Sequence, residues 1–267
     1  ENGYKEITLL GQNVDSYLWY GGGLKKDYIK ASKIQKQTSI NFSKLLELVA
    51  KSFPNTRIRF TTSNPQDMDD DVLYTMAKYS NICNHIHLPV QSGSDEILNK
   101  MNRKHTVFEY LNLIKKIKRI LPDCSISQDM ITGFPDETED DHLATLNLMD
   151  NVKYDFGFMF KYSERPGTLA ARKLNDNVPE EIKKRRLSEI IDRQLKHSFE
   201  NLSKYVGKKV EVLIEKESKK SDNHWAGRNP QNIIVVFPKK NFLRGEYATV
   251  KIINHTSTTL IGEVIIA

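Results

Sequence analysis

Short apolar runs alternate with amphipathic segments along most of the chain. Five runs with strand character begin near residues 5, 57, 85, 125 and 155. Between most of them lie segments whose apolar residues recur with the period of a helix. Strands that alternate with helices predict right-handed βαβ units and therefore a parallel sheet. Five strands are too few for a complete eight-stranded barrel, so we expect an α/β fold with either a partial parallel barrel or a doubly wound sheet.

Two helices can be predicted in detail. The first follows Asn41, a suitable N-cap, and its apolar face consists of Phe42, Leu45, Leu46, Val49 and Phe53. The second begins after Pro179, whose fixed φ suits a helix start. Its apolar stripe consists of Leu187, Ile190, Ile191, Leu195, Phe199 and Leu202. Ahead of the first helix, residues 20–39 are polar and rich in Gly and Lys, which predicts a long loop.

The pattern changes to all-β after Gly207. Four short apolar runs, at 208–215, 232–238, 247–254 and 260–267, are separated by turn-like segments. Such runs predict a small antiparallel barrel. We therefore place the domain boundary near Tyr205, with one domain at 1–205 and a second at 206–267.

Charge and cysteine content narrow the function classes. The net charge of +6 and the pI of about 9.0 favour an anionic partner. No apolar run is long enough to cross a bilayer, and no signal peptide is recognisable, so no membrane role is expected. Cys83 and Cys124 are far apart in sequence and form neither a disulfide framework nor a metal motif. The reducing cytoplasm is the simplest location.

Four of the predicted strands end in small or amide-bearing polar residues. These ends are Gly11-Gln12-Asn13, Thr61-Thr62-Ser63-Asn64, Gln91-Ser92-Gly93-Ser94, and Asp129 followed by Gly133. In parallel α/β folds, ligands bind at the carboxyl ends of the strands. The residues are also ordinary turn formers, but four such ends favour a site for a polar ligand. After the last strand, Glu164 and Arg165 fit either a surface ion pair or a substrate clamp.

The stretch "HIHLPVQSGSDE" raises two further possibilities. His85 and His87 alternate and so face the same side of a strand, but no third metal ligand accompanies them, which favours a packing or hydrogen-bonding role. The loop around Gly93 lacks the GxxxxGK[ST] pattern of a phosphate loop. Asp95 and Glu96 would also repel a phosphate at that helix start. We therefore predict neither a metal site nor a phosphate loop.

The β-rich domain combines basic and aromatic side chains. Lysines and arginines, among them Lys209, Lys219 and Arg228, are interleaved with Trp225, Phe237 and Phe242. Basic groups neutralise phosphates and aromatic faces stack on bases, so single-stranded or looped RNA is the expected partner. A solvated lysine-rich surface with the aromatic residues in the core is the alternative.

Longer sequence words are shared with a known family. They are "EITLLGQNV", "RIRFTTSNP", "HIHLPVQSGSDEILNKMNR", "GFPDETEDD", "FKYSERPGT" and "GRNPQN". With these words in order over nearly the whole chain, the sequence resembles the radical S-adenosylmethionine methylthiotransferases. It resembles most the branch that adds a methylthio group to carbon 2 of isopentenylated adenosine beside the tRNA anticodon. The resemblance implies a partial radical S-adenosylmethionine barrel followed by a TRAM domain, a small RNA-binding β-barrel.

The resemblance also implies cofactors and partners. S-adenosylmethionine and two [4Fe–4S] clusters would serve the full-length protein, and a tRNA anticodon stem-loop would be its partner. The family holds one cluster on a CxxxCxxC segment and the other on three cysteines of an N-terminal domain, and clusters need such thiolates. Both sets are expected upstream of Glu1, so this chain alone is expected to hold no metal, carry no catalytic residue and be inactive. The sulfur donor is not identified.

Site residues follow from the resemblance position by position. Those implied to line the S-adenosylmethionine pocket are Gln12, Asn13, Ser63, Gln91, Ser92, Ser94 and Asp129. Those implied to face the substrate are Tyr162, Glu164 and Arg165. Those expected to contact RNA are Lys209, Lys219, Arg228, Asn229 and Asn232. Asn64 stands where the family commonly has His, so no role that depends on that His is carried over.

Two other functions remain open at this stage. A sister branch modifies an aspartate of a small-subunit ribosomal protein, but it usually carries acidic residues where "NPQN" stands here. A non-catalytic RNA-binding module built on a barrel is the other possibility.

Overall fold

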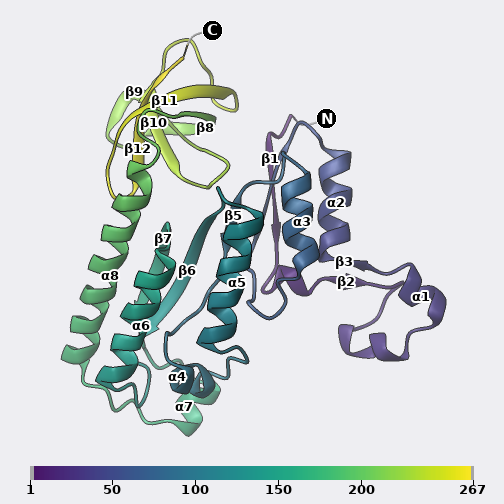
Figure 1. Ribbon diagram of the computed structural model, residues 1–267, viewed down its shortest axis with the longest axis vertical. Coiled ribbons are helices and arrows are strands. Elements are labelled where there is room, and N and C mark those ends of the chain that lie inside the picture. Colours follow the sequence, from purple (N-terminus) through teal and green to yellow (C-terminus); the bar gives the residue numbers. More distant parts are fainter. Residues whose placement is uncertain (1–2, 266–267) are drawn as a thin grey trace.

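Five parallel strands follow one another in chain order and form an open arc (Figure 1). They are β1 (Glu6–Leu10), β4 (Arg57–Thr61), β5 (His85–His87), β6 (Ser125–Thr132) and β7 (Phe156–Lys161). The computed structural model describes residues 3–265. β1 pairs with β4, β6 lies between β5 and β7, and a backbone bridge from Ile58 to Ile82 joins the two groups. The predicted α/β fold is confirmed, and the arc is the partial barrel.

Helices cover the convex face of this arc. They are α2 (Phe42–Ser52), α3 (Asp70–Lys78), α5 (Val107–Ile120), α6 (Glu139–Val152) and α8 (Glu180–Ser203), with the short α4 (Asp95–Lys100) and α7 (Leu169–Lys173) near the loops. Asn41 caps α2 as predicted, because its Oδ1 accepts the Lys44 N–H at 3.1 Å. A continuous apolar core, which includes Leu46, Ile86 and Tyr110, fills the space between helices and strands. Within the described residues, no helix is long and apolar enough to cross a membrane.

The segment predicted as a long loop is partly ordered, and that prediction was wrong. It contains a 3₁₀ helix, η2 (Lys25–Lys30), and the short helix α1 (Lys33–Gln37). The segment projects from the arc and connects two short antiparallel strands, β2 (Leu18–Trp19) and β3 (Ile40–Asn41) (Figure 1). A second 3₁₀ helix, η1 (Val14–Ser16), precedes β2. A capping box explains α1, since Ser32 and Gln35 satisfy each other's backbone N–H groups.

Helix α8 packs through part of the predicted apolar stripe and through polar side chains beside it. Ile190 and Leu202 are buried, but Leu195 and Phe199 are exposed, at 40% and 52%. Its buried face includes Gln194 and Asn201, whose amides donate to the carbonyls of Tyr154 and Lys153 at 2.9 and 2.8 Å. The helix lies against the end of α6 and the start of β7, where free carbonyls must be satisfied, and this explains the polar face. Phe53 also departs from its predicted face, because α2 has already ended there and the side chain is exposed.

The second body is a closed five-stranded barrel in the order β10-β12-β11-β8-β9. Its strands are β8 (Lys209–Ser218), β9 (Ser221–Arg228), β10 (Ile234–Pro238), β11 (Tyr247–His255) and β12 (Thr259–Val264). Sequence patterning missed β9, since "SDNHWAGR" has too few apolar residues to alternate. The barrel is antiparallel except where β10 pairs with β12 in parallel and closes it. Leu202 and Tyr205 already pack on its core.

The small barrel sits at the amino ends of the parallel strands (Figure 1). Tyr247 of β11 donates its O–H to the carbonyl of Lys5, just before β1, at 2.9 Å. Ser125, at the start of β6, donates to the carbonyl of Gln231 at 2.6 Å. We call this end of the arc the floor, and we call the opposite end, where the strands finish, the mouth.

A matched pair of substitutions tests the packing of α8. Ile190→Ala should lower the free energy of unfolding by about 2–5 kcal/mol, because a fully buried side chain leaves a cavity. Leu195→Ala should cost less than about 1 kcal/mol, because that side chain lies at the surface and its removal leaves no enclosed cavity. Urea unfolding followed by circular dichroism measures both. Equal losses would mean that the predicted stripe packs over its full width, with Leu195 included.

Candidate functional site

A line of hydrogen-bonded side chains runs along the concave face of the arc. The Ser127 hydroxyl lies 2.9 Å from His85 Nε2 and 2.8 Å from His87 Nδ1, so it bridges the two rings. His87 Nε2 lies 3.4 Å from Asp129 Oδ1, nearer the mouth. Burial lowers the pKa of His85 to about 3, so this ring is neutral, and it stacks on Phe156. These contacts are the hydrogen-bonding and packing roles expected of the two histidines.

The mouth offers polar side chains from both ends of the arc. Gln12 follows β1 and is exposed, whereas Asn13 donates to Asp67 Oδ2 at 2.6 Å. Asp129 keeps 28% of its side chain accessible. Beyond β7, Glu164 and Arg165 are exposed, and within residues 3–265 their side chains form no ion pair with each other. The geometry therefore leaves both groups available to a ligand.

Tyr162 occupies an intermediate position at this rim. Its ring meets Phe134 edge-on at 5.0 Å, and the Lys183 ammonium lies 5.4 Å from its centre. Burial, followed by the nearby Glu164, raises the pKa of its hydroxyl, so Tyr162 stays a neutral donor. It is held in place by packing but is not enclosed.

Four side chains predicted to line the cofactor pocket are instead buried in the protein. Ser63 donates to Asp15 Oδ1 at 3.2 Å, and Ser92 is fully buried beside Thr145. Ser94 caps α4 and donates to Asp141 Oδ1 at 2.5 Å. Gln91 is buried too, with a positive φ of 75°. The hydroxyls of Ser63, Ser92 and Ser94 are bonded inside the fold, and their contacts with the cofactor stay predictions.

Gly93 explains why this loop is pressed against α6. A Cβ at that position would lie 2.5 Å from the Thr145 Cα and 2.6 Å from the Ala144 carbonyl oxygen. Both contacts are with backbone, which cannot move aside easily. The serine-rich loop after β5 is therefore a helix-packing element that shapes the wall of the mouth.

Buried Asp15 was missed by the sequence analysis. One of its oxygens accepts from Ser63, and the other has no partner within the described residues. Burial raises the pKa of this carboxyl from 3.8 to about 7, with Ser63 opposing the shift. It borders a hollow of about 440 Å³ together with Lys25, Asp67 and Asp69. Its place just after Gln12 and Asn13 was the available signal, but nothing local shows burial.

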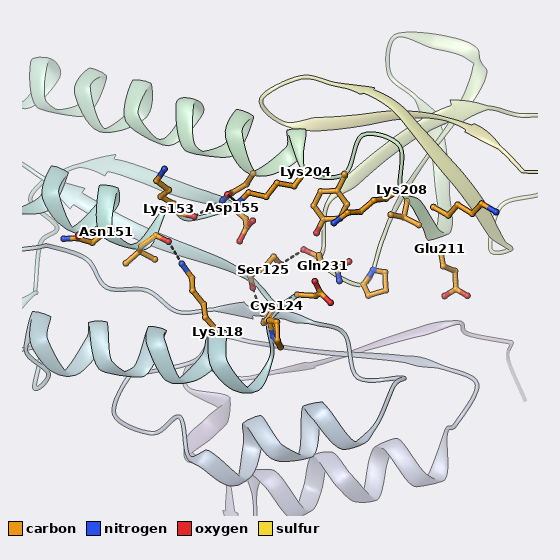
Figure 2. A pocket seen from close by; sticks show the side chains of 18 of the residues that line it. Lys118, Cys124, Ser125, Asn151, Lys153, Asp155, Lys204, Lys208, Glu211 and Gln231 are labelled. Atoms are coloured by element: carbon orange, nitrogen blue, oxygen red, sulfur yellow. Dashed lines mark hydrogen bonds between the residues drawn. The ribbon is translucent and has the colours of Figure 1, made fainter.

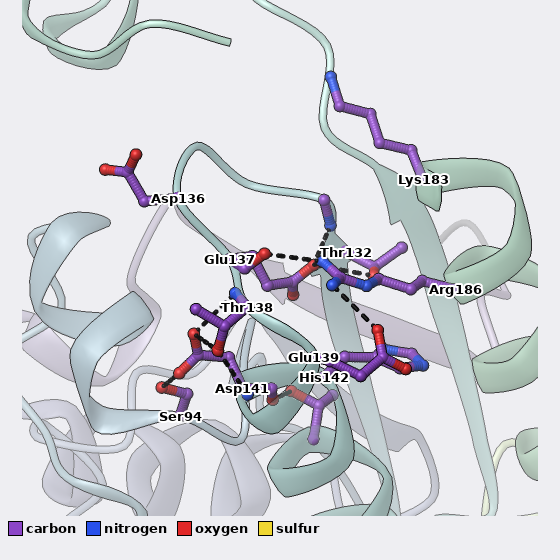
Figure 3. Close-up of polar contacts among 12 residues, drawn as sticks. Ser94, Thr132, Asp136, Glu137, Thr138, Glu139, Asp141, His142, Lys183 and Arg186 are labelled. Atoms are coloured by element: carbon purple, nitrogen blue, oxygen red, sulfur yellow. Dashed lines mark hydrogen bonds and ion pairs between the residues drawn. The ribbon is translucent and has the colours of Figure 1, made fainter. Parts of the chain in front are cut away.

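A buried ion pair at the rim was also missed (Figure 3). Glu137 accepts the Gly133 N–H at 2.5 Å and an Arg186 N–H at 2.9 Å, and both side chains are almost fully buried. Burial raises the pKa of Glu137, with Gly133 and Arg186 opposing the shift. Arg186 also reaches Glu139 at 3.1 Å. The start of α8 thus fixes the loop after β6.

A lysine-lined groove of about 710 Å³ separates the arc from the small barrel (Figure 2). Lys209, one of the predicted RNA contacts, lies on its edge with Lys204 and Lys208. Lys118 donates to the Val152 carbonyl at 2.6 Å, at the end of α6. Because carboxyl ends of helices carry partial negative charge, Lys118 and Lys204 compensate helix dipoles, whereas Lys208 and Lys209 add surface charge. The groove by itself therefore does not identify an anion site.

The "GRNPQN" turn, between β9 and β10, contacts the arc. Asn229 is fully buried, and its Oδ1 accepts the Ile233 N–H at 2.9 Å, so its side chain shapes the turn and its contact with RNA stays a prediction. Arg228 bonds to Glu215, Asn232 and Glu6 at 2.6, 2.7 and 3.1 Å, which leaves its guanidinium little freedom to bind RNA. Lys219, in contrast, is exposed in the turn between β8 and β9.

Asp15→Asn tests the buried carboxyl. The folded protein holds the Asp15 proton more tightly than the unfolded chain, whose carboxyl has a pKa of 3.8. The resulting stabilisation is complete below pH 3.8 and is lost as the pH rises through the folded pKa of about 7. The wild type should therefore lose about 2–4 kcal/mol relative to Asp15→Asn between pH 4 and 8. Urea unfolding across that range measures the difference, with exposed Asp69→Asn as the control. Parallel pH profiles for wild type and Asp15→Asn would contradict the assignment.

Comparison with known proteins agrees with this architecture. The model of the radical SAM superfamily matches residues 1–149, and that of the TRAM domain matches residues 203–265. A tRNA-2-methylthio-N(6)-dimethylallyladenosine synthase of Christiangramia forsetii is 66% identical over 98% of this chain and 54% of its own length. The protein of the same name from Flavobacterium johnsoniae is 62% identical, over 98% and 55%. This chain thus spans about half the length of the curated relatives it matches.

Among solved structures, the radical SAM enzyme coproporphyrinogen III oxidase of Escherichia coli superposes with a TM-score of 0.48 and 17% identity. That superposition covers 76% of this chain and 52% of the other, and it adds nothing to the assignment. The superfamily model, in contrast, covers more than half of the chain and contains all but the last strand of the arc. Superfamily membership implies S-adenosylmethionine and a [4Fe–4S] cluster as cofactors. The chain belongs to the radical SAM superfamily, and it carries a TRAM domain after the arc.

Proposed function

We propose that the chain forms part of a tRNA methylthiotransferase that modifies carbon 2 of N6-isopentenyladenosine beside the anticodon. The observation that carries the proposal is the 66% identity, over nearly the whole chain, to a tRNA-2-methylthio-N(6)-dimethylallyladenosine synthase. In this proposal residues 1–205 supply the walls of the cofactor and substrate pocket, and residues 206–267 hold the RNA. The cytoplasm, where tRNA is modified, is the proposed location.

The mouth of the arc is the proposed pocket. Gln12, Asn13 and Asp129 are the side chains that remain accessible there, and they would bind S-adenosylmethionine through hydrogen bonds. When bound next to a reduced cluster, that cofactor supplies radical chemistry. Ser63, Gln91, Ser92 and Ser94 would act indirectly, by keeping the walls of the mouth rigid.

Substrate contacts are proposed for the loop after β7. Arg165 carries five N–H donors on a planar group, which suits phosphate or base edges. Glu164 can accept hydrogen bonds from exocyclic amines, and neutral Tyr162 can donate one. The support for these roles is positional, because all three residues lie at the mouth.

The iron–sulfur ligands of this proposal lie outside the described residues. Within residues 3–265, no group of three His, Cys, Asp or Glu side chains could hold a metal ion. Cys83 and Cys124 are both buried, and burial raises the pKa of each thiol, which opposes the thiolate form that binds iron. Two clusters, each held by cysteines elsewhere in the full-length protein, complete the proposal.

RNA binding is proposed for the solvent-facing side of the TRAM domain. Lys219 and Lys220 project from the β8–β9 turn, and Lys239, which pairs with Glu217 at 2.5 Å, lies 4.7 Å from the centre of the Trp225 ring. Ammonium groups beside a partly buried aromatic face suit phosphates next to stacked bases. Lys209 would add charge at the groove, and Arg228, Asn229 and Asn232 would act by shaping the turn.

A lysine substitution tests this surface. Lys219→Ala should weaken binding of an anticodon stem-loop by about 1 kcal/mol, because one phosphate contact is lost. For the same reason, the slope of the logarithm of the affinity against the logarithm of the salt concentration should fall in magnitude by about 1. Fluorescence anisotropy with the 267-residue chain measures both quantities. Lys26→Ala, an exposed change in η2, is the control. Unchanged affinity and salt slope in Lys219→Ala would remove this residue from the RNA surface.

Reconstitution tests the assignment of cluster ligands. Incubated with iron and sulfide under reducing conditions, the 267-residue chain should gain no visible absorption band of a [4Fe–4S] cluster, because its two thiols are buried and protonated. The double variant Cys83→Ala, Cys124→Ala is the matched control. A band that persists in this variant would show that other residues hold a cluster and would overturn the assignment.

A further inference from the structure

Two buried arginines on the floor of the arc hold the backbone of the TRAM domain. Arg57 and Arg59 are alternate residues of β4, so both point to the concave face, and each is 5% exposed. A guanidinium has five N–H donors and no acceptor, so its burial requires several acceptors. The nearest apolar core lies on the other side of the strand, around Ile58 and Phe60. The acceptors come mainly from the second domain.

Arg57 is bound on two sides. It donates to the Arg228 carbonyl at 2.7 Å, to the Glu211 carbonyl at 3.0 Å and to the Glu211 carboxylate at 2.8 Å. Its guanidinium also lies 4.8 Å from the centre of the Tyr247 ring. These contacts reach β8, the end of β9 and β11, so a single side chain touches three strands of the TRAM barrel.

Arg59 binds the turn itself. It donates to the carbonyls of Asn229 and Pro230 at 2.7 and 3.0 Å, and its Nε donates to Glu6 at 2.8 Å. The other oxygen of Glu6 accepts from Arg228 at 3.1 Å. Glu6 therefore joins an arginine of the arc to an arginine of the TRAM domain. Because most acceptors are backbone carbonyls, the two guanidinium groups recognise the path of the TRAM backbone rather than particular side chains.

The contacts come from three separate strands of the arc. Besides the arginines of β4, Glu6 belongs to β1 and Ser125 to β6, where it bonds to Gln231. Points of attachment on three strands fix both the position and the orientation of a rigid body. Two further links are the hydrogen bond from Tyr247 to the Lys5 carbonyl and helix α8, whose 24 residues span about 36 Å from the rim to the TRAM domain.

We propose that Arg57 and Arg59 are positioning residues that lock the "GRNPQN" turn into the floor and so fix the TRAM domain relative to the mouth. The proposal rests on the proposed function, in which RNA held by the TRAM domain must present one adenosine at the mouth. A freely rotating TRAM domain would still bind RNA but would spread the target base over many positions. The contacts of Arg57 and Arg59 with the TRAM domain, which we call the clamp, remove that freedom before RNA binds.

Distances between the two domains test the clamp directly. Lys115→Cys on α5 and Lys220→Cys in the β8–β9 turn place two spin labels on exposed sites, while Cys83 and Cys124 are buried. Double electron–electron resonance should give a narrow distribution of distances between the two spin labels in the otherwise wild-type chain. Arg57→Gln with Arg59→Gln should broaden it, and Arg119→Gln, an exposed arginine of α5, should not.

A more conservative pair of substitutions keeps the test valid if the glutamine variant does not fold. Arg57→Lys with Arg59→Lys keeps both charges but removes the forked donors, so it should fold and still broaden the distribution. Circular dichroism verifies the fold of each variant. A folded lysine or glutamine pair with the wild-type distribution would overturn the proposal.

An RNA experiment separates positioning from binding. With an anticodon stem-loop carrying a photoreactive base at the target position, the lysine pair should keep the wild-type affinity. Cross-linking of that base to the Tyr162–Arg165 loop should fall about tenfold, because the effective concentration of the base at the mouth drops. Unchanged cross-linking despite a broadened distribution would overturn the positioning role. If the wild-type chain binds no stem-loop, the proposed function fails, and the distance measurement still judges the clamp.

Discussion

The common direction of the five strands is the constraint on which the rest of the structure depends. Parallel strands place all their carboxyl ends at one edge and all their amino ends at the other, so the arc has two chemically different ends. Polar loops gather at the mouth because each strand is followed by a connection there. The floor receives only the incoming strand starts, whose side chains are then available to hold the TRAM domain. One topological fact thus separates the ligand end from the docking end.

Buried charged side chains that hold the two ends of the molecule joined by α8 are the second organising feature. At the start of α8 Arg186 pairs with Glu137, and beyond its end the TRAM domain is held by Arg57 and Arg59. Buried ion pairs and polar contacts contribute little net stability, since desolvation offsets most of the attraction. They do penalise any arrangement in which a partner is lost, because an unpaired buried charge is costly. We interpret the polar face of α8 as a device for a unique alignment, with stability supplied by the apolar cores.

The sequence words that carry the family resemblance mostly build walls and contacts. In "HLPVQSGS" the serines bond to α6 or cap α4, and Gly93 allows the close approach of the two elements. In "GRNPQN" the buried asparagine shapes a turn that the floor arginines bind. Polar residues in a strand-end loop are therefore as able to position a site as to line it. Exposure distinguishes the two roles, and exposure is a property of the whole fold.

Local patterns in the sequence were sufficient for the alternation of strands and helices in the arc, the parallel direction of its strands, the small β-barrel and the cap of α2, because periodicity and capping depend on near neighbours. They also located the mouth, since the direction of parallel strands decides where their loops meet. Strand β9, the polar face of α8 and the burial of Asp15, Ser92 and Asn229 were decided by contacts between distant segments. The pairing of Arg57 and Arg59 with carbonyls some 170 residues away belongs to the same class. A sequence shows which side chains can form hydrogen bonds, but only the tertiary structure decides which partner removes each of them from water.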